Sequence, residues 1–139
     1  MSERVNDKII EIEKYLEELY QIVPSDFEMY KDDFKIKAAC ERYFEKIIES
    51  VIDLGFILVK EKNFKIPEDE ESIFEVLFKE KIISEELSRK LKDAKGMRNF
   101  IIHQYEKIND ELVFEVLAEN LEKDIKDFVG FVGRLEWKK

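Results

Sequence analysis

Apolar residues recur along almost the whole chain at the spacing of an α-helix. Near the N-terminus they step by four and three, the spacing that presents one narrow seam to a neighbouring helix. The residues of this first seam are Val5, Ile9, Ile12, Leu16, Leu19 and Val23. No segment alternates cleanly with the period of two that a half-buried strand requires. The pattern therefore predicts an all-α protein.

Prolines and capping residues mark where the first two helices end and begin. Pro24 ends the first predicted helix, and Ser25-Asp26-Phe27-Glu28 reads as a capping box that starts the second. No other proline occurs before Pro67. The second helix is therefore expected to run for roughly 35 residues, or about 50 Å, unless Gly55 bends it. Such a helix outreaches a small globule, so we expect it to serve a dimer interface as well.

Three more helices are predicted in the second half of the chain. The acidic run in NFKIPEDEES, residues 63–72, suits the first turn of a short helix, where carboxylates complement the helix dipole. Ser84-Glu85-Glu86 caps a fourth helix and Asn109-Asp110 caps a last one. We therefore expect a single domain over residues 1–139, an up-and-down bundle of four principal helices plus a short one.

The charge limits which partners suit the chain. A net charge of -9 repels a polyanion at long range, which argues against non-specific binding of nucleic acid. Between Ser84 and Lys107 the balance reverses, because six basic residues face four acidic ones. Any contact with RNA is therefore expected to be local.

Cysteine usage and the N-terminus bear on location. The single cysteine, Cys40, cannot form an internal disulfide and is expected to be a buried apolar residue. The start MSERVNDKII lacks a basic stretch followed by an apolar run, and no apolar segment reaches 18 residues. We expect a soluble cytoplasmic protein.

One short stretch, GMRNFIIHQY, combines the only histidine with an Arg-Asn pair and a tyrosine. Each residue of a helix turns by about 100°, so Asn99 and His103 lie about 40° apart on one face. Arg98 and Tyr105 differ by only about 20° on a neighbouring face. We expect the four polar groups to line one ridge beside the apolar face of the helix, held rigidly by Phe100 and the residues after it.

The spacing Arg98-Asn99, three apolar residues and His103-Gln104-Tyr105 resembles the R-x4-H-x-Y motif of HEPN-domain toxins of the HepT type. The likeness extends to the segment from Glu41-Arg42 to Gly55, to Pro67 before an acidic helix, and to Gly96-Met97. The resemblance implies a dimeric helical bundle whose motifs form a metal-independent ribonuclease site. It also implies a small nucleotidyltransferase antitoxin, of the MntA type, that adenylylates the tyrosine matched by Tyr105.

The residue types suit this chemistry. Cleavage of RNA removes a proton from the 2′-hydroxyl, a step for which an imidazole is suited, so His103 is assigned as general base. Arg98 is assigned to stabilise charge on the phosphorane, and Asn99 to orient the imidazole or donate to phosphate. A two-fold interface supplies a second imidazole as the acid. Neither a metal ion nor another cofactor is expected.

Two alternatives remain open from the sequence. The chain is otherwise a non-catalytic binding module that holds a nucleotidyltransferase or its substrate, a reading that the net charge of -9 favours slightly. A metal-dependent enzyme that uses the many carboxylates is the other alternative. It is weakened because glutamates at helical spacing usually form a solvated face and the chain has no second histidine.

Overall fold

The computed structural model describes residues 1–103 and 108–135, and within these ranges all regular structure is helical. Four long helices are present, as the sequence predicts, and several shorter helical pieces join them where the sequence predicts one. The elements are α1 (Glu3–Ile22), α2 (Phe27–Asp32), α3 (Phe34–Glu61), η1 (Glu70–Ser72), α4 (Ile73–Lys79), α5 (Glu85–His103), α6 (Asp110–Glu115), η2 (Val116–Asn120) and α7 (Leu121–Gly133).

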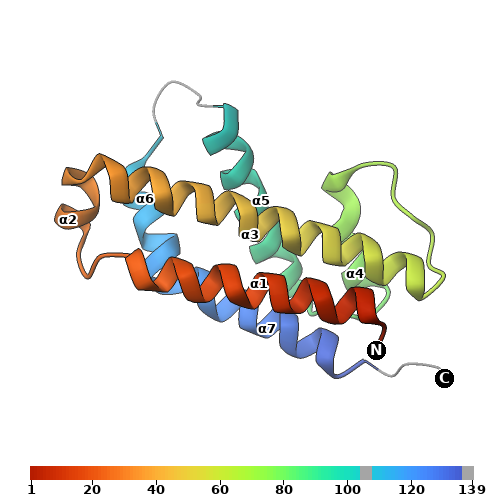
Figure 1. The fold of residues 1–139 in the computed structure, drawn as a ribbon. Helices are drawn as coiled ribbons and strands as arrows, with labels where there is room; N and C mark the ends of the chain where they lie inside the picture. The colour runs from red at the N-terminus through yellow and green to blue at the C-terminus, as the bar shows by residue number, and fades with distance from the viewer. Residues whose placement is uncertain (104–107, 136–139) are drawn as a thin grey trace.

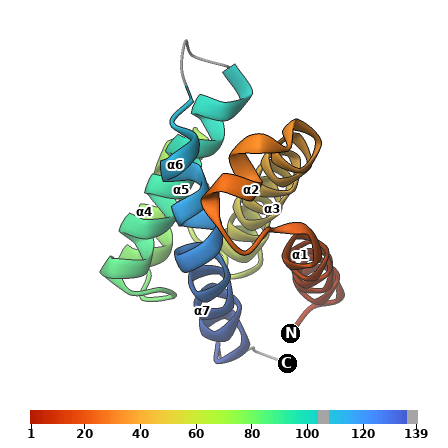
Figure 2. The ribbon, with the colours of Figure 1, turned by 90° about the vertical axis from the view of Figure 1, so that its left-hand side faces the viewer.

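Helices α1 and α3 lie side by side along the bundle, with α7 beside α1, and α5 crosses behind α3 (Figure 1). The end-on view separates the α1–α3 pair from α4 and α5, with α7 below and between them (Figure 2). The first predicted seam packs as expected, because Val5, Ile9, Ile12, Leu16 and Leu19 are all buried. One core joins these residues to the apolar faces of α3, α4, α5, α6 and α7.

The second predicted helix is broken at Asp33, which corrects the expectation of one continuous helix of roughly 35 residues. The backbone of Asp33 is extended, and its carboxylate accepts hydrogen bonds from the amides of Lys35 and Ile36. A short side chain that bonds the backbone locally competes with helix continuation, so α2 ends and α3 is capped at the same residue. Asp26 rather than Ser25 caps α2, through the amide of Met29 at 2.9 Å.

The other predicted helix starts are confirmed by their caps. Ser84 Oγ accepts from the amide of Leu87 at 3.1 Å, and Asn109 accepts from Leu112 at 3.1 Å. The last predicted helix contains a five-residue π-helical stretch, η2, between α6 and α7. Cys40 is fully buried, and burial raises the pKa of its thiol to about 11. It is therefore the apolar residue that the sequence predicts.

Gly55 does not bend α3, but it lets α4 pack closely against α3. A side chain at this buried position would place its Cβ 2.9 Å from Cγ1 of Ile73, closer than packed carbons approach. The missing side chain therefore lets the N-terminus of α4 approach α3 closely. This placement matters for the site, because the segment just before α4 covers one face of α5.

A partly buried polar cluster lies where α2, α3 and α6 meet. Lys37 Nζ lies 2.7 Å from Asp110 Oδ2, while Tyr30 Oη and Glu41 Oε2 have no hydrogen-bond partner among the described residues. Burial raises the pKa of Glu41, and the nearby Asp110 raises it further although Lys37 opposes the shift. The folded protein therefore holds this proton more tightly than the unfolded chain.

A pH dependence of stability follows from Glu41. Its contribution is fully present below the unfolded pKa of about 4.5 and is lost as the pH rises through the higher folded pKa. We expect Glu41→Gln to flatten the decline of the unfolding free energy over this window. Urea unfolding from pH 4.5 to 7.5 measures it, with Glu13→Gln, at an exposed position of α1, as the control. Equal pH profiles for wild type and Glu41→Gln would contradict the assignment.

Candidate active site

Helix α5 carries the described part of the motif in its last two turns. Ser84 fixes its start, and Leu87, Leu91 and Ile101 bury one side against the core. The helix contacts α3, α4 and α7, so three elements fix its orientation about its own axis. The motif residues consequently leave the helix in directions that packing determines.

Arg98 points into the molecule. The residue is only 6% exposed, with its guanidinium between α3 and η1. Nη1 lies 3.8 Å from Glu49 Oε1, Nη2 lies 3.4 Å from Glu70 Oε2, and the buried Nε has no partner among the described residues. Charge-assisted hydrogen bonds are usually 2.7–2.9 Å long. The donor fork of Arg98 is thus surrounded by carboxylates but only loosely bonded.

His103 ends α5 on the exposed surface, and Asn99, one turn earlier, is half-buried. The imidazole is therefore open to a large substrate. The expected single ridge of polar groups is wrong for Arg98, because Arg98 and His103 are five residues apart and leave the helix about 140° from one another. Tyr105, the remaining member of the expected ridge, lies outside the described residues.

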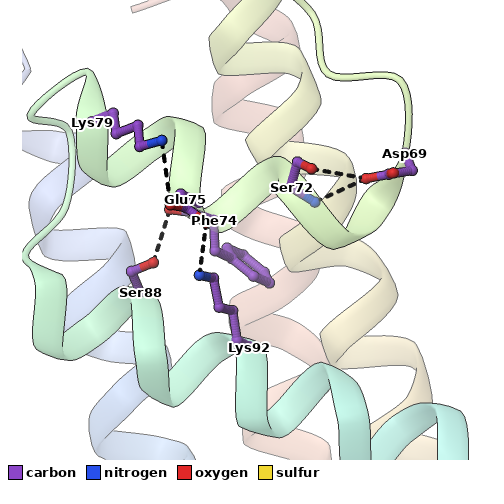
Figure 3. Close-up of polar contacts among 7 residues, drawn as sticks. All are labelled: Asp69, Ser72, Phe74, Glu75, Lys79, Ser88 and Lys92. Carbon is purple, nitrogen blue, oxygen red and sulfur yellow. Dashed lines mark hydrogen bonds and ion pairs between the residues drawn. The ribbon is translucent and has the colours of Figure 1, made fainter.

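A second buried cation, Lys95, was missed in the sequence. It lies one turn before Arg98, its side chain is only 4% exposed, and its Nζ is 2.6 Å from Glu71 Oε1. One turn further back, Lys92 pairs with Glu75 (Figure 3). The Lys92 Nζ and Glu75 Oε2 atoms lie 3.2 Å apart. The signal in the sequence was the spacing 92, 95 and 98, which places three cations along one side of a helix.

The acidic run before α4 also has a contact that its dipole role does not explain. Asp69 caps η1 by accepting from the amide and hydroxyl of Ser72 (Figure 3), at the helix start where the sequence predicts acidic residues. Glu70 and Glu71 instead reach across to Arg98 and Lys95. Sequence position alone could not reveal this contact, since more than twenty residues separate the partners.

An apolar groove of about 650 Å³ runs beside the motif between α5, α6 and the start of α7. Met97, Phe100 and Leu112 are among the residues that line it, and Phe100 and Leu112 are 40% and 48% exposed. Gly96 also faces the groove, and a Cβ added there would meet no atom within 4 Å. The groove thus offers uncovered apolar surface that adjoins the catalytic candidates.

In residues 1–103 and 108–135, no group of three or more His, Cys, Asp or Glu side chains is arranged to hold a metal ion. Within the same ranges, no helix is both long and apolar enough to span a membrane.

Comparison with known proteins places this geometry in a family. The family model described as ribonuclease HepT-like matches residues 12–132. The mRNA nuclease HepT of Shewanella oneidensis is 25% identical over 95% of this chain and 98% of the relative. A protein of Archaeoglobus fulgidus, provisionally named an RNase, is 34% identical over 77% of this chain and 82% of its own.

A solved structure shares the whole fold. The tri-AMPylated HEPN toxin of Shewanella oneidensis, solved in complex with an MNT antitoxin, superposes with a TM-score of 0.90 at 24% identity. The match covers 97% of this chain and all of the toxin. The family model covers the second half of α1, all of α3 and α5, almost all of α7 and the described motif, so the chain belongs to the HepT-like ribonuclease family.

Proposed function

We propose that the chain is the toxin of a toxin–antitoxin pair, a metal-independent endoribonuclease that acts as a homodimer in the cytoplasm. The observation that carries the proposal is the placement of Arg98, Asn99 and His103 near the end of one helix, with the imidazole exposed, in a chain whose relatives are named as nucleases. The antitoxin is a nucleotidyltransferase that adenylylates Tyr105. This partner is proposed because the related toxin was solved with an MNT antitoxin and in an AMPylated state.

In this mechanism His103 takes the proton from the 2′-hydroxyl that attacks the phosphodiester. Arg98 stabilises the charge that develops on the phosphorane, and Asn99, one turn before His103, orients the imidazole. The partner subunit's His103 protonates the leaving 5′-oxygen, since each chain has one histidine. The products are a 2′,3′-cyclic phosphate end and a 5′-hydroxyl end.

The direct test is cleavage of total RNA by purified protein in the presence of a chelator. Fragments that end in 2′,3′-cyclic phosphate are the expected result. A second candidate function, a non-catalytic module that holds a nucleotidyltransferase, is favoured by the net charge of -9 and by the carboxylates around Arg98. Intact RNA at every protein concentration, together with stable binding of the nucleotidyltransferase, would favour that candidate instead.

We expect the protein to be a dimer in solution, with the groove beside α5 in the interface. Burial of the exposed apolar groove would supply the hydrophobic driving force, and Gly96 lets another helix approach closely. Leu112→Glu places a charge in the groove and should shift the protein toward monomer in light scattering at micromolar concentration. Ile10→Glu, on the exposed side of α1, is the control and should remain dimeric. A wild-type monomer would count against the composite site.

Tyr105 should accept adenylate from the cognate nucleotidyltransferase, and the modified protein should lose RNA cleavage. The added phosphate and nucleoside would bring negative charge and bulk to the residue that follows His103 by two positions, where substrate phosphate must bind. Intact-mass and peptide mass spectrometry measure the modification, with Tyr105→Phe as the matched control. A label found only on another residue would refute the assignment.

A further inference from the structure

Three cations on one side of α5 are paired with three carboxylates of the segment that precedes and begins α4. Lys92, Lys95 and Arg98 follow one another at intervals of three residues, about 4.5 Å along the helix axis. Their carboxylate partners occur in the opposite order along the sequence. The pairs are Lys92 with Glu75 at 3.2 Å, Lys95 with Glu71 at 2.6 Å, and Arg98 with Glu70 at 3.4 Å.

Burial is strongly unequal within the two inner pairs. The side chains of Lys95 and Arg98 are 4% and 8% exposed, whereas those of Glu71 and Glu70 are 76% and 54% exposed. The two cations therefore lie beneath the two carboxylates, and the carboxylates face solvent. In addition, the buried Nε of Arg98 has no hydrogen-bond partner among the described residues. A buried donor without a partner is costly, so the fork of Arg98 retains capacity for an anionic ligand.

The covering segment is attached to the core mainly through α4. Ile73, Phe74 and Leu77 are buried, and Ser88 Oγ donates to the carbonyl of Phe74 at 3.0 Å (Figure 3). By contrast, residues 68–71 are all exposed, and η1 has no buried residue. Glu70 and Glu71 can consequently leave their partners without unpacking any apolar side chain.

From this geometry we propose that Lys95 and Arg98 together bind adjacent phosphates of the RNA, and that Glu70 and Glu71 occupy this site until the RNA displaces them. Carboxylate and phosphate are alternative anionic ligands of guanidinium and ammonium groups, so one can replace the other on the same donors. The inference rests on the proposed nuclease function and adds a residue, Lys95, and a competing pair of carboxylates to it. It also gives buried Arg98 a route to the substrate.

The salt dependence of binding provides a distinctive signature of this exchange. Each phosphate neutralised by a cation releases counterions, with a slope of about -0.7 in log K against log salt concentration for a single strand. In the wild type, added salt also screens the two ion pairs that the RNA must break, which partly offsets that loss of affinity. When Glu70 and Glu71 are neutral the offset disappears. The slope should then become steeper, by less than the value of about 1.4 that two neutralised phosphates contribute in total.

The experiment measures binding of a fluorescein-labelled single-stranded RNA by anisotropy over a salt series, in a His103→Ala background that prevents cleavage. Glu70→Gln/Glu71→Gln is expected to bind roughly tenfold more tightly and with the steeper slope. The matched control, Glu122→Gln/Asp127→Asn, makes the same change in net charge by removing the exposed partners of Lys126 and Lys123 on α7. It should change affinity by less than about twofold.

Lys95→Met is the complementary variant, since methionine can occupy the space of the buried lysine side chain but carries no charge. It should weaken binding at least threefold and reduce the salt slope by about 0.7 when Glu71 is also Gln. Circular dichroism and thermal unfolding verify the fold of each variant, and Lys95→Gln serves if the methionine variant is unfolded. Unchanged RNA affinity in folded Lys95 variants would overturn the proposed role of Lys95.

Failure of this inference and failure of the proposed function give different results. If the carboxylate variant binds RNA no more tightly than the α7 control, the inference is overturned, while cleavage by wild type would leave the nuclease function standing. If wild type leaves RNA intact in chelator, the nuclease function fails. The binding comparison requires no cleavage and still decides whether Lys95 and Arg98 form a covered phosphate site.

Discussion

Replacement of His103 by alanine is expected to lower the rate constant of RNA cleavage by about 10²- to 10⁴-fold, the usual contribution of a positioned general acid or base. The loss should fall at the upper end, because a two-fold dimer loses both imidazoles at once. His103 is exposed at the end of α5 and is not among the buried core residues. The variant should therefore keep the wild-type unfolding temperature and oligomeric state.

Arg98→Ala should abolish cleavage as well, since it removes the charge that stabilises the phosphorane. Arg98→Lys should recover little activity, because an ammonium group lacks the planar fork of the guanidinium. Unlike His103→Ala, the alanine variant is expected to change stability, since it leaves Glu49 and Glu70 without their common partner.

Single-turnover assays with a labelled RNA measure both losses, and light scattering confirms that each variant remains assembled. Lys123→Ala on α7 is the control for charge removal, since its only described ion pair is with Asp127 on the same helix. Full cleavage by a folded, dimeric His103→Ala protein would refute the role of the imidazole. Full cleavage by Arg98→Ala would refute the role of the guanidinium in the same way.

The largest effect on stability is expected for Phe128→Ala in α7. Phe128 is fully buried in the core that joins α7 to the other long helices. Truncating a buried phenylalanine removes its transfer free energy and leaves a cavity, at a cost of about 3–5 kcal/mol. Native domains are stable by only about 5–15 kcal/mol, so this loss would consume a large share of the folding free energy.

Urea unfolding measured at one protein concentration for all variants tests the value, because a dimer couples stability to concentration. Phe34→Ala is the matched control, since Phe34 is 76% exposed at the start of α3. It should change the unfolding free energy by less than about 0.5 kcal/mol. A loss below about 1 kcal/mol for Phe128→Ala would contradict the packing of α7 described above.

The helical architecture was predictable because the information is local. Apolar residues at intervals of three and four specify the buried face of each helix. Ser84 and Asn109 indicate two helix starts, and the structure confirms both caps. The break at Asp33 was missed for a related reason. Its carboxylate bonds two amides of the next turn, and the apolar spacing on both sides continues as though the helix were unbroken.

The candidate site was only partly predictable. The motif residues and their helix were identified from spacing, and the exposure of His103 agrees with a role at the surface. The direction of the Arg98 side chain could not be predicted, since it depends on which side of α5 faces α3 and η1. Neither Lys95 nor the carboxylates of Glu70 and Glu71 carried a motif. Their contact joins segments that are distant in sequence, and only the packed bundle makes them neighbours.

By itself, the sequence determined an all-helical domain, the helix that bears Arg98, Asn99 and His103, and the family to which the chain belongs. The helical features depend on residue spacing within each helix, where a rotation of about 100° per residue relates position to face, and the family resemblance depends on residues spread from Glu41 to Tyr105. Only the tertiary structure decided that Arg98 and Lys95 lie beneath carboxylates while His103 faces solvent. That arrangement depends on how α4, admitted by Gly55, packs against α3 and so places the acidic segment across α5. Such packing arises from contacts between distant segments, and no local pattern encodes it.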